Sequence, residues 1–81
     1  MRVRYFAWLR ERVGESSETV QTDAATVREL VDDLSGREER YALAFADLSA
    51  VRVAVDEELA DLAAPLSGVR EVAFFPPMTG G

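Results

Sequence analysis

The chain has 81 residues, 48% of them hydrophobic, and a formal net charge of −6 at pH 7. This length favours a single domain with a modest core, and this hydrophobic content argues against an intrinsically disordered chain. The acidic balance argues against nucleic acid as a partner, because phosphate backbones bind basic surfaces. No stretch approaches the length of a membrane span, and the first residues lack a signal-peptide layout. We therefore expect a cytoplasmic protein with neither a nucleic-acid nor a membrane partner.

Two residue types that commonly take part in catalysis, cysteine and histidine, are missing from the sequence. Without cysteine there is no disulfide, thiolate metal site or cysteine nucleophile. Without histidine the most common general base and the most common metal ligand are absent. The acidic residues form no dense loop of the calcium-binding kind, so we expect neither a metal site nor a permanently bound cofactor. The chain is poorly equipped to be an enzyme by itself, and we expect no independent activity.

The first quarter of the sequence predicts two strands with a short helical turn between them. Residues 2–8 have the aromatic and β-branched bias of a strand. Alternation places Val3, Tyr5 and Ala7 on a core face, and Arg2, Arg4, Phe6 and Trp8 on the other. The second face is half charged and half aromatic, which is unusual for a face that meets only solvent. Residues 9–14 then predict a helical turn that ends at Gly14, and residues 17–22 a second strand, antiparallel to the first.

The clearest local signal is an amphipathic helix over residues 27–35. Thr26 is followed three residues later by Glu29, which is the spacing of a capping box. Four apolar residues then recur at helical spacing: Val27, Leu30, Val31 and Leu34. We expect Gly36 to end this helix. A second, shorter helical stretch has the same spacing in Tyr41, Ala44, Phe45 and Leu48.

The rest of the chain predicts three more strands. Residues 51–55 alternate valine with other residues, as a strand does. Asp56 and Glu57 are a candidate turn into a short return strand that contains Leu59. The last strand, residues 71–75, alternates in the same way, with Val72 and Phe74 on one face and Glu71, Ala73 and Phe75 on the other.

Pro76 and Pro77 must end the last strand, because proline cannot donate a backbone hydrogen bond to a sheet. The last strand can lie parallel to the first, through the long crossover that contains the helix. This order predicts an α+β fold: a ubiquitin-like β-grasp with a mixed β-sheet and one main helix packed across it. We expect a domain of residues 1–75 followed by a flexible C-terminal tail, residues 76–81.

The tail ends in two glycines, Gly80 and Gly81, which contribute nothing to a core. Because glycine has no Cβ, such a tail can thread its backbone into a narrow site on another protein. The terminal carboxylate is inert until it is activated, for instance as a mixed anhydride with AMP, and a nucleophile or sulfur donor can then attack it. We therefore expect Gly81 to be the working residue, with the catalytic groups in partner proteins. Four further residues would enter the same narrow site of the partner: Pro76, Pro77, Met78 and Thr79.

Three segments carry a resemblance to a known family: RVRYFAWLRERVG, RYALAFAD and, above all, EVAFFPPMTGG. Over nearly its whole length the chain resembles the small subunits of molybdopterin synthase, the sulfur carriers of molybdenum-cofactor biosynthesis. The resemblance implies that a ubiquitin-activating-like adenylyltransferase uses ATP to adenylate Gly81, and that a sulfur donor protein then supplies sulfur to form a thiocarboxylate. The loaded tail would enter the large synthase subunit and give its sulfur to cyclic pyranopterin monophosphate, forming the molybdopterin dithiolene.

The same resemblance implies a heterotetramer of two small and two large subunits, with Gly80 beside Gly81 in the channel of the large subunit. It also implies an apolar patch that binds both partners, at Phe6, Leu59 and Phe75. Phe6 and Phe75 would be neighbours if the first and last strands pair; otherwise they form a small cluster under the chain's own loops. Arg10, in the family's Arg-Glu motif, would meet an acidic group on the activating enzyme or remain in solvent. Arg4 and Glu71 would pair across the same face.

Other functions share this fold and tail. A ubiquitin-like protein modifier would be joined through Gly81 to lysines of target proteins, and archaeal modifiers share the FPP-x-x-GG ending. All nine basic residues here are arginine, so a modifier of this sequence could not build chains on its own lysines. A sulfur carrier for thiamine or cysteine biosynthesis is a further alternative, although thiamine carriers are usually shorter and lack residues 37–48. The last alternative is an interaction module with an incidental Gly-Gly end.

Overall fold

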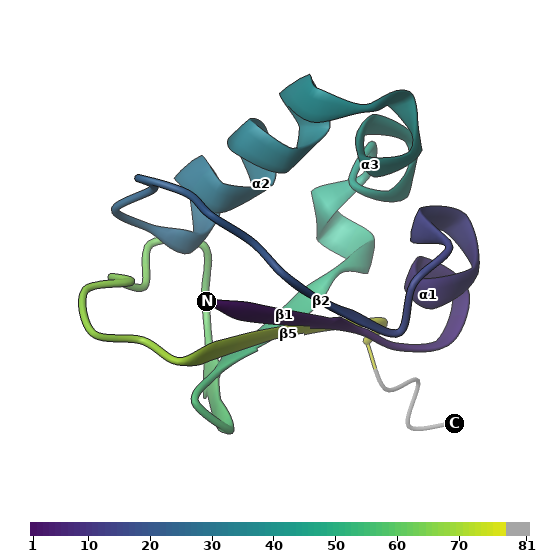
Figure 1. The fold of residues 1–81 in the computed structure, drawn as a ribbon. Helices are drawn as coiled ribbons and strands as arrows, with labels where there is room; N and C mark the ends of the chain where they lie inside the picture. The colour runs from purple at the N-terminus through teal and green to yellow at the C-terminus, as the bar shows by residue number, and fades with distance from the viewer. Residues whose placement is uncertain (78–81) are drawn as a thin grey trace.

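The computed structural model of the chain describes residues 1–77. Within them lie five strands, three α-helices and one 3₁₀ turn. In chain order these are β1 (Arg2–Tyr5), α1 (Ala7–Val13), β2 (Ser17–Thr19), α2 (Val27–Arg37), α3 (Glu39–Ala44), η1 (Leu48–Ala50), β3 (Arg52–Val55), β4 (Glu58–Ala60) and β5 (Glu71–Phe75). Figure 1 shows the three helices on the same side of the sheet. No helix within this part of the chain is both long and apolar enough to cross a membrane.

The five strands form one mixed sheet in the order β2-β1-β5-β3-β4. β1 pairs with β5 in parallel, and the other three pairings are antiparallel. The parallel register places Val3 beside Val72 and Tyr5 beside Phe74. These findings confirm the predicted α+β architecture, a ubiquitin-like β-grasp whose final strand lies beside the first.

The core lies between the sheet and the helices. Alternation along β1 and β5 turns Val3, Tyr5, Val72 and Phe74 toward it, and all four are buried. The Phe74 ring packs edge-on against the Phe45 ring, with 4.9 Å between centroids. Full burial of one such side chain contributes about 1.5–3 kcal/mol. This packing holds β5, and with it the start of the tail, firmly in the middle of the sheet.

The predicted first strand is too long. The structure ends β1 at Tyr5, and Ala7 adopts φ 53°, a left-handed conformation that is uncommon for alanine. The chain therefore turns sharply into α1, so Ala7 and Trp8 belong to this helix and not to two faces of a strand. The helix ends as predicted at Gly14, which has φ 87° and donates its backbone N–H to the Arg10 carbonyl oxygen at 2.8 Å.

The side-chain cap predicted at Thr26, where α2 begins, is confirmed. The Thr26 hydroxyl oxygen accepts from the backbone N–H of Glu29 at 3.2 Å and donates to the Glu29 carboxylate at 3.3 Å. The predicted end at Gly36 is wrong, because α2 continues through Arg37. Glu38, whose backbone is extended, lies between the two helices: it follows the end of α2 and precedes the start of α3. The second helical stretch consists of two short pieces, α3 and the 3₁₀ turn η1.

The second predicted strand is shortened to β2, whose central residue belongs to a polar cluster. Glu18 Oε2 accepts hydrogen bonds from the hydroxyl groups of Tyr5, at 2.8 Å, and Tyr41, at 2.6 Å. Arg40 donates to the Tyr41 hydroxyl oxygen at 3.1 Å and to the Val13 carbonyl oxygen at 2.6 Å. We call these side chains the tyrosine cluster. It joins α3 to β1, β2 and the end of α1.

The turn predicted at Asp56 and Glu57 is confirmed between β3 and β4. Both residues have positive φ, 47° and 71°, which is the backbone twist favoured in two-residue hairpins. Asp56 Oδ1 also accepts from the backbone N–H groups of Arg70 and Glu71, at 3.0 and 2.9 Å. The hairpin therefore fixes the first residue of β5, the strand from which the tail extends.

Candidate functional site

The face of the sheet that points away from the helices changes character from one edge to the other. One row of cross-strand neighbours runs from Ser17 through Arg4, Ala73 and Ala54 to Leu59. The row is polar over β2 and β1 and apolar over β5, β3 and β4. Because alternate residues of a strand point to opposite faces, this row lies opposite the buried core.

On the apolar half lies a shallow hollow of about 430 Å³, which we call the apolar depression. Its lining residues are Phe6, Ala54, Ala73, Phe75 and Pro76. The two small alanines make the floor low, and the larger side chains surround it. An exposed apolar surface of this kind, beside polar residues, is typical of a protein docking site.

The position of Phe6 depends on the pairing of β1 with β5. The Phe6 backbone N–H donates to the Phe74 carbonyl oxygen at 3.1 Å, which extends the parallel ladder one residue beyond β1. The left-handed turn at Ala7 then takes the chain away from the sheet. The Phe6 side chain is left 38% exposed at the rim of the apolar depression, next to the end of β5.

The predicted interface residues do not all lie together. Phe6 and Phe75 line the same depression, so their expected proximity is confirmed. Leu59 is 78% exposed on β4 and lies beside the floor residue Ala54, outside the lining of the depression. Arg10 lies on α1 and lines a different hollow on the other side of Phe6.

The start of the predicted tail borders the depression. Pro76 and Pro77 follow β5 without regular secondary structure and are partly buried, and Pro76 lines the depression. Four of the predicted site residues lie outside the described residues: Met78, Thr79, Gly80 and Gly81. The described part of the candidate site is therefore the base of the tail and the apolar depression beside it.

The polar half of the same face contains a groove of about 320 Å³, which we call the cationic groove. Its lining residues are Arg2, Arg4, Tyr5, Phe6, Arg10, Ser16, Ser17 and Glu71. The predicted pair of Arg4 and Glu71 is confirmed, with Arg4 Nη1 3.9 Å from Glu71 Oε2. Both side chains are partly exposed, so this contact contributes little to stability. The sequence signal for the groove is the charged and aromatic face that the alternation of residues 2–8 predicts.

The two tyrosine hydroxyl groups of the tyrosine cluster have raised pKa values. Burial, and then the hydrogen bond to Glu18, raise the pKa of Tyr41 to about 12, and the same causes raise the pKa of Tyr5 further. Both hydroxyl groups are therefore protonated at neutral pH and act as donors to Glu18. Across residues 1–77, no three or more acidic side chains are grouped so that they could hold a metal ion.

Comparison with known proteins gives consistent matches over the whole chain. The model of the ThiS family matches residues 3–81. The chain is 40% identical to the molybdopterin synthase sulfur carrier subunit of Escherichia coli (strain K12), over 100% of this chain and 99% of the relative. Its structure is similar to that of SAMP1 from Haloferax volcanii, with a TM-score of 0.74, 28% identity and coverage of 100% and 98% of the two chains. It is also similar to small archaeal modifier protein 1 of H. volcanii, with a TM-score of 0.66, 26% identity and coverage of 96% and 97%.

Proposed function

The chain belongs to the ThiS family, and from this premise we propose that it is the sulfur carrier subunit of a molybdopterin synthase. The proposal is supported by its full-length identity of 40% with a relative of that description. The partner that this function requires is the large subunit of the synthase, in a heterotetramer of two small and two large subunits.

In the proposed mechanism the terminal carboxylate of Gly81 is the reacting group. A carboxylate oxygen attacks the α-phosphorus of ATP on an adenylyltransferase, which releases pyrophosphate and forms an acyl-adenylate. A sulfur donor protein then supplies sulfur at the oxidation level of sulfide. This sulfur attacks the acyl carbon, the bond to AMP breaks, AMP leaves, and a thiocarboxylate results. Inside the large subunit the sulfur passes to the pterin precursor, and water supplies the oxygen that restores the Gly81 carboxylate. Gly80 and Gly81 suit this role because backbone without a Cβ can approach partner groups closely.

The observation that carries the proposal is the position of the apolar depression at the base of the tail. Phe75 ends β5, Pro76 follows, and both line the depression together with Phe6. A partner bound there lies directly beside the point where the tail leaves the sheet. The six residues 76–81 can reach at most about 20 Å when fully extended, so a partner's active site must lie within this distance of the end of β5 to receive Gly81.

A second candidate function, attachment to target proteins, is favoured by the similarity to two solved structures of an archaeal modifier. The similarity to small archaeal modifier protein 1 extends over 96% of this chain. A modifier would use the same activated Gly81, but an amine of a target protein would attack it instead of a sulfur donor. A sulfur carrier for thiamine or cysteine biosynthesis would differ only in the final acceptor. The three functions therefore differ in the molecule that receives the sulfur, or the acyl group, of Gly81.

The decisive experiment is intact-protein mass spectrometry. The chain is incubated with its adenylyltransferase, ATP and a sulfur donor, and then with the large subunit and the pterin precursor. We expect a mass gain equal to one oxygen-to-sulfur exchange at Gly81, which disappears when the precursor is added. A variant that lacks Gly81 is the control, and it should fold with the same stability but gain no sulfur. The modifier would be favoured instead if the chain were found joined to lysines of other proteins and the pterin precursor consumed no thiocarboxylate.

A further inference from the structure

We propose that the cationic groove is a second part of the docking surface. It binds carboxylate side chains of an acidic segment on the large subunit of the synthase. The inference rests on the proposed function, because it concerns the partner that binds beside the tail. It goes beyond that function in naming the chemistry of a second contact. The apolar depression would bind an apolar part of the partner, and the groove an acidic part next to it.

The charge of the groove is opposite to that of the whole molecule. The chain contains fifteen acidic and nine basic residues, which give its net charge of −6. The groove is lined by three arginines and one carboxylate, so its charge is 3 − 1 = +2. One third of the basic residues thus gather in one hollow. A concave site of one sign attracts groups of the opposite sign more strongly than scattered surface charges do.

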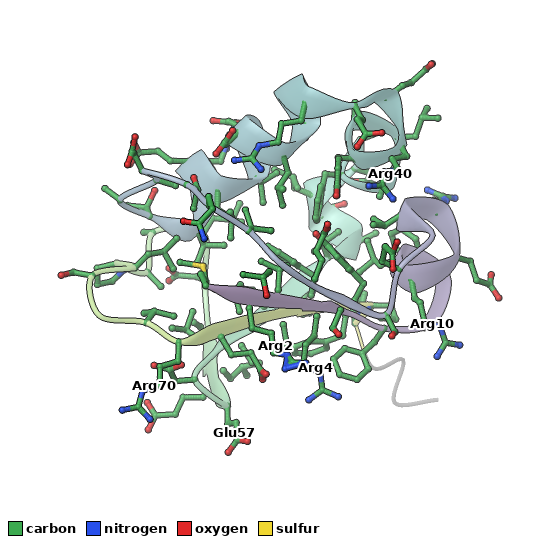
Figure 2. The ribbon with its side chains drawn as sticks, viewed as in Figure 1. Arg2, Arg4, Arg10, Arg40, Glu57 and Arg70 are labelled. Carbon is green, nitrogen blue, oxygen red and sulfur yellow. The ribbon has the colours of Figure 1, made fainter. Side chains whose placement is uncertain are left out.

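The three arginines come from two elements that meet at this side of the sheet. Arg2 and Arg4 alternate along β1, so both point away from the core, and Arg10 extends from α1. Figure 2 shows the side chains of Arg2 and Arg4 on the side of the sheet that faces away from the helices. Ser16 and Ser17 add hydroxyl groups at the rim.

These guanidinium groups are available for a ligand. Within the described residues, the side chains of Arg2 and Arg10 take part in no hydrogen bond or ion pair with the chain itself. Arg4 is 3.9 Å from Glu71, which is too long for a hydrogen bond and leaves its N–H donors free. By contrast, Arg37 is held by Asp33 at 3.0 Å. A guanidinium group binds a carboxylate with two parallel hydrogen bonds, so the groove fits acidic side chains well.

The groove and the depression form one continuous surface because Phe6 lines both. The Arg4 guanidinium lies over the Phe6 ring, 4.9 Å from its centroid, at the boundary between them. An apolar partner residue over Phe6 would therefore place neighbouring residues of the same partner in the groove. This continuity favours a protein as the occupant. A nucleic acid would be repelled by the net charge of −6 and would gain nothing from the apolar half.

The proposal is tested by measuring the binding kinetics of the synthase large subunit to the intact chain. One test variant is Arg2→Gln, which leaves the contact between Arg4 and Phe6 intact. The other is the double variant that combines Arg2→Gln with Arg4→Gln. Arg28→Gln is the matched control, because Arg28 is an exposed arginine on α2 with one carboxylate neighbour, Asp32, at 3.5 Å. Each titration is run at about 0.05 M and about 1 M salt, where the Debye length falls to about 3 Å.

At low salt we expect the double variant to associate with the large subunit about tenfold more slowly than the unaltered chain does. The single variant should also associate more slowly, but by a smaller factor. The differences should disappear at high salt, and Arg28→Gln should match the unaltered chain throughout. Equal association rates and equal salt dependence for all four proteins would overturn the proposal, as would a loss that is confined to the dissociation rate and persists at high salt. If the folded, unaltered chain does not bind the large subunit at all, the proposed function itself fails and the inference fails with it.

Discussion

Tyr41 shows how one hydroxyl group can hold several elements together. Its oxygen donates to Glu18 Oε2 at 2.6 Å and accepts from Arg40 at 3.1 Å. Tyr5 donates to the same carboxylate oxygen at 2.8 Å. A buried polar group whose partner is removed costs free energy of desolvation, so each member of the tyrosine cluster depends on the others.

The substitution Tyr41→Phe removes this hydroxyl and leaves the ring. We expect the free energy of unfolding at pH 7 to fall by about 1–2 kcal/mol, because Glu18 loses a donor. Burial raises the pKa of Tyr41 to about 12 in the folded chain, above the ordinary tyrosine pKa of about 10. The hydroxyl's contribution is therefore fully present below pH 10 and is lost as the pH rises through 12. Urea titrations at pH 7 and in steps to pH 12 measure both effects.

The control for Tyr41 is a double-mutant cycle with Glu18→Gln. If the two side chains act together, the effects of the two substitutions will not add. The stability difference between the unaltered chain and Tyr41→Phe should also shrink at alkaline pH, although Tyr5 still titrates in both proteins. Additive effects, or a difference that stays constant from pH 7 to pH 12, would contradict the role given to the hydroxyl.

The two ends of α2 are determined by different kinds of contact. The beginning depends on Thr26 and Glu29, which are three residues apart. The end depends on the packing of α2 against α3, which begins at Glu39 after a single extended residue, Glu38. Gly36 therefore lies inside the helix instead of ending it.

This placement predicts the effect of Gly36→Ala. Gly36 has no positive φ, and a Cβ at this position would meet no atom within 4 Å apart from its chain neighbours and the nearby backbone of its own helix. Alanine restricts the unfolded chain and favours the helix, so we expect the free energy of unfolding to rise by about 0.5–1 kcal/mol. Gly14→Ala is the matched control and should destabilise, because Gly14 has φ 87°. Thermal and urea unfolding measure both, and a loss of stability in Gly36→Ala would show that the glycine ends the helix after all.

The two sides of the sheet differ in character. The helices lie on one side of the sheet (Figure 1), with the core beneath them. The apolar depression and the cationic groove lie on the other side. Two well-exposed leucines test this division. Leu59 lies on β4 beside the depression, whereas Leu43 lies on α3 in the helical layer.

We expect Leu59→Arg to weaken binding to the large subunit about tenfold or more, because the new charge would lose solvent in an apolar contact. Leu43→Arg should leave the affinity unchanged. Leu59 is 78% exposed and Leu43 58%, so neither substitution should change stability by more than about 0.5 kcal/mol. Calorimetric titration of the large subunit with each variant measures the affinities. Equal affinities for Leu59→Arg and the unaltered chain would remove Leu59 from the interface.

Several features of this protein follow from residues that are neighbours along the chain. The cap at Thr26, the helix end at Gly14 and the alternation of Val72 and Phe74 are all confirmed, because each signal acts within one helical turn or one strand. The proposed role of Gly80 and Gly81 also rests on the sequence alone, but it stays a prediction. This prediction needs no knowledge of the folded domain.

Other features arise only when distant segments meet. Nothing in the local sequence marks Ala7 for a left-handed turn, and Gly36 resembles a helix end until α3 is packed beside α2. The apolar depression combines Phe6, Ala54 and Phe75, which belong to three different parts of the chain. Their proximity depends on the register of β1 and β3 against β5. That register is set because one face of every strand must be buried at the same time. A short stretch of sequence does not determine it, since the register depends on all the strands together.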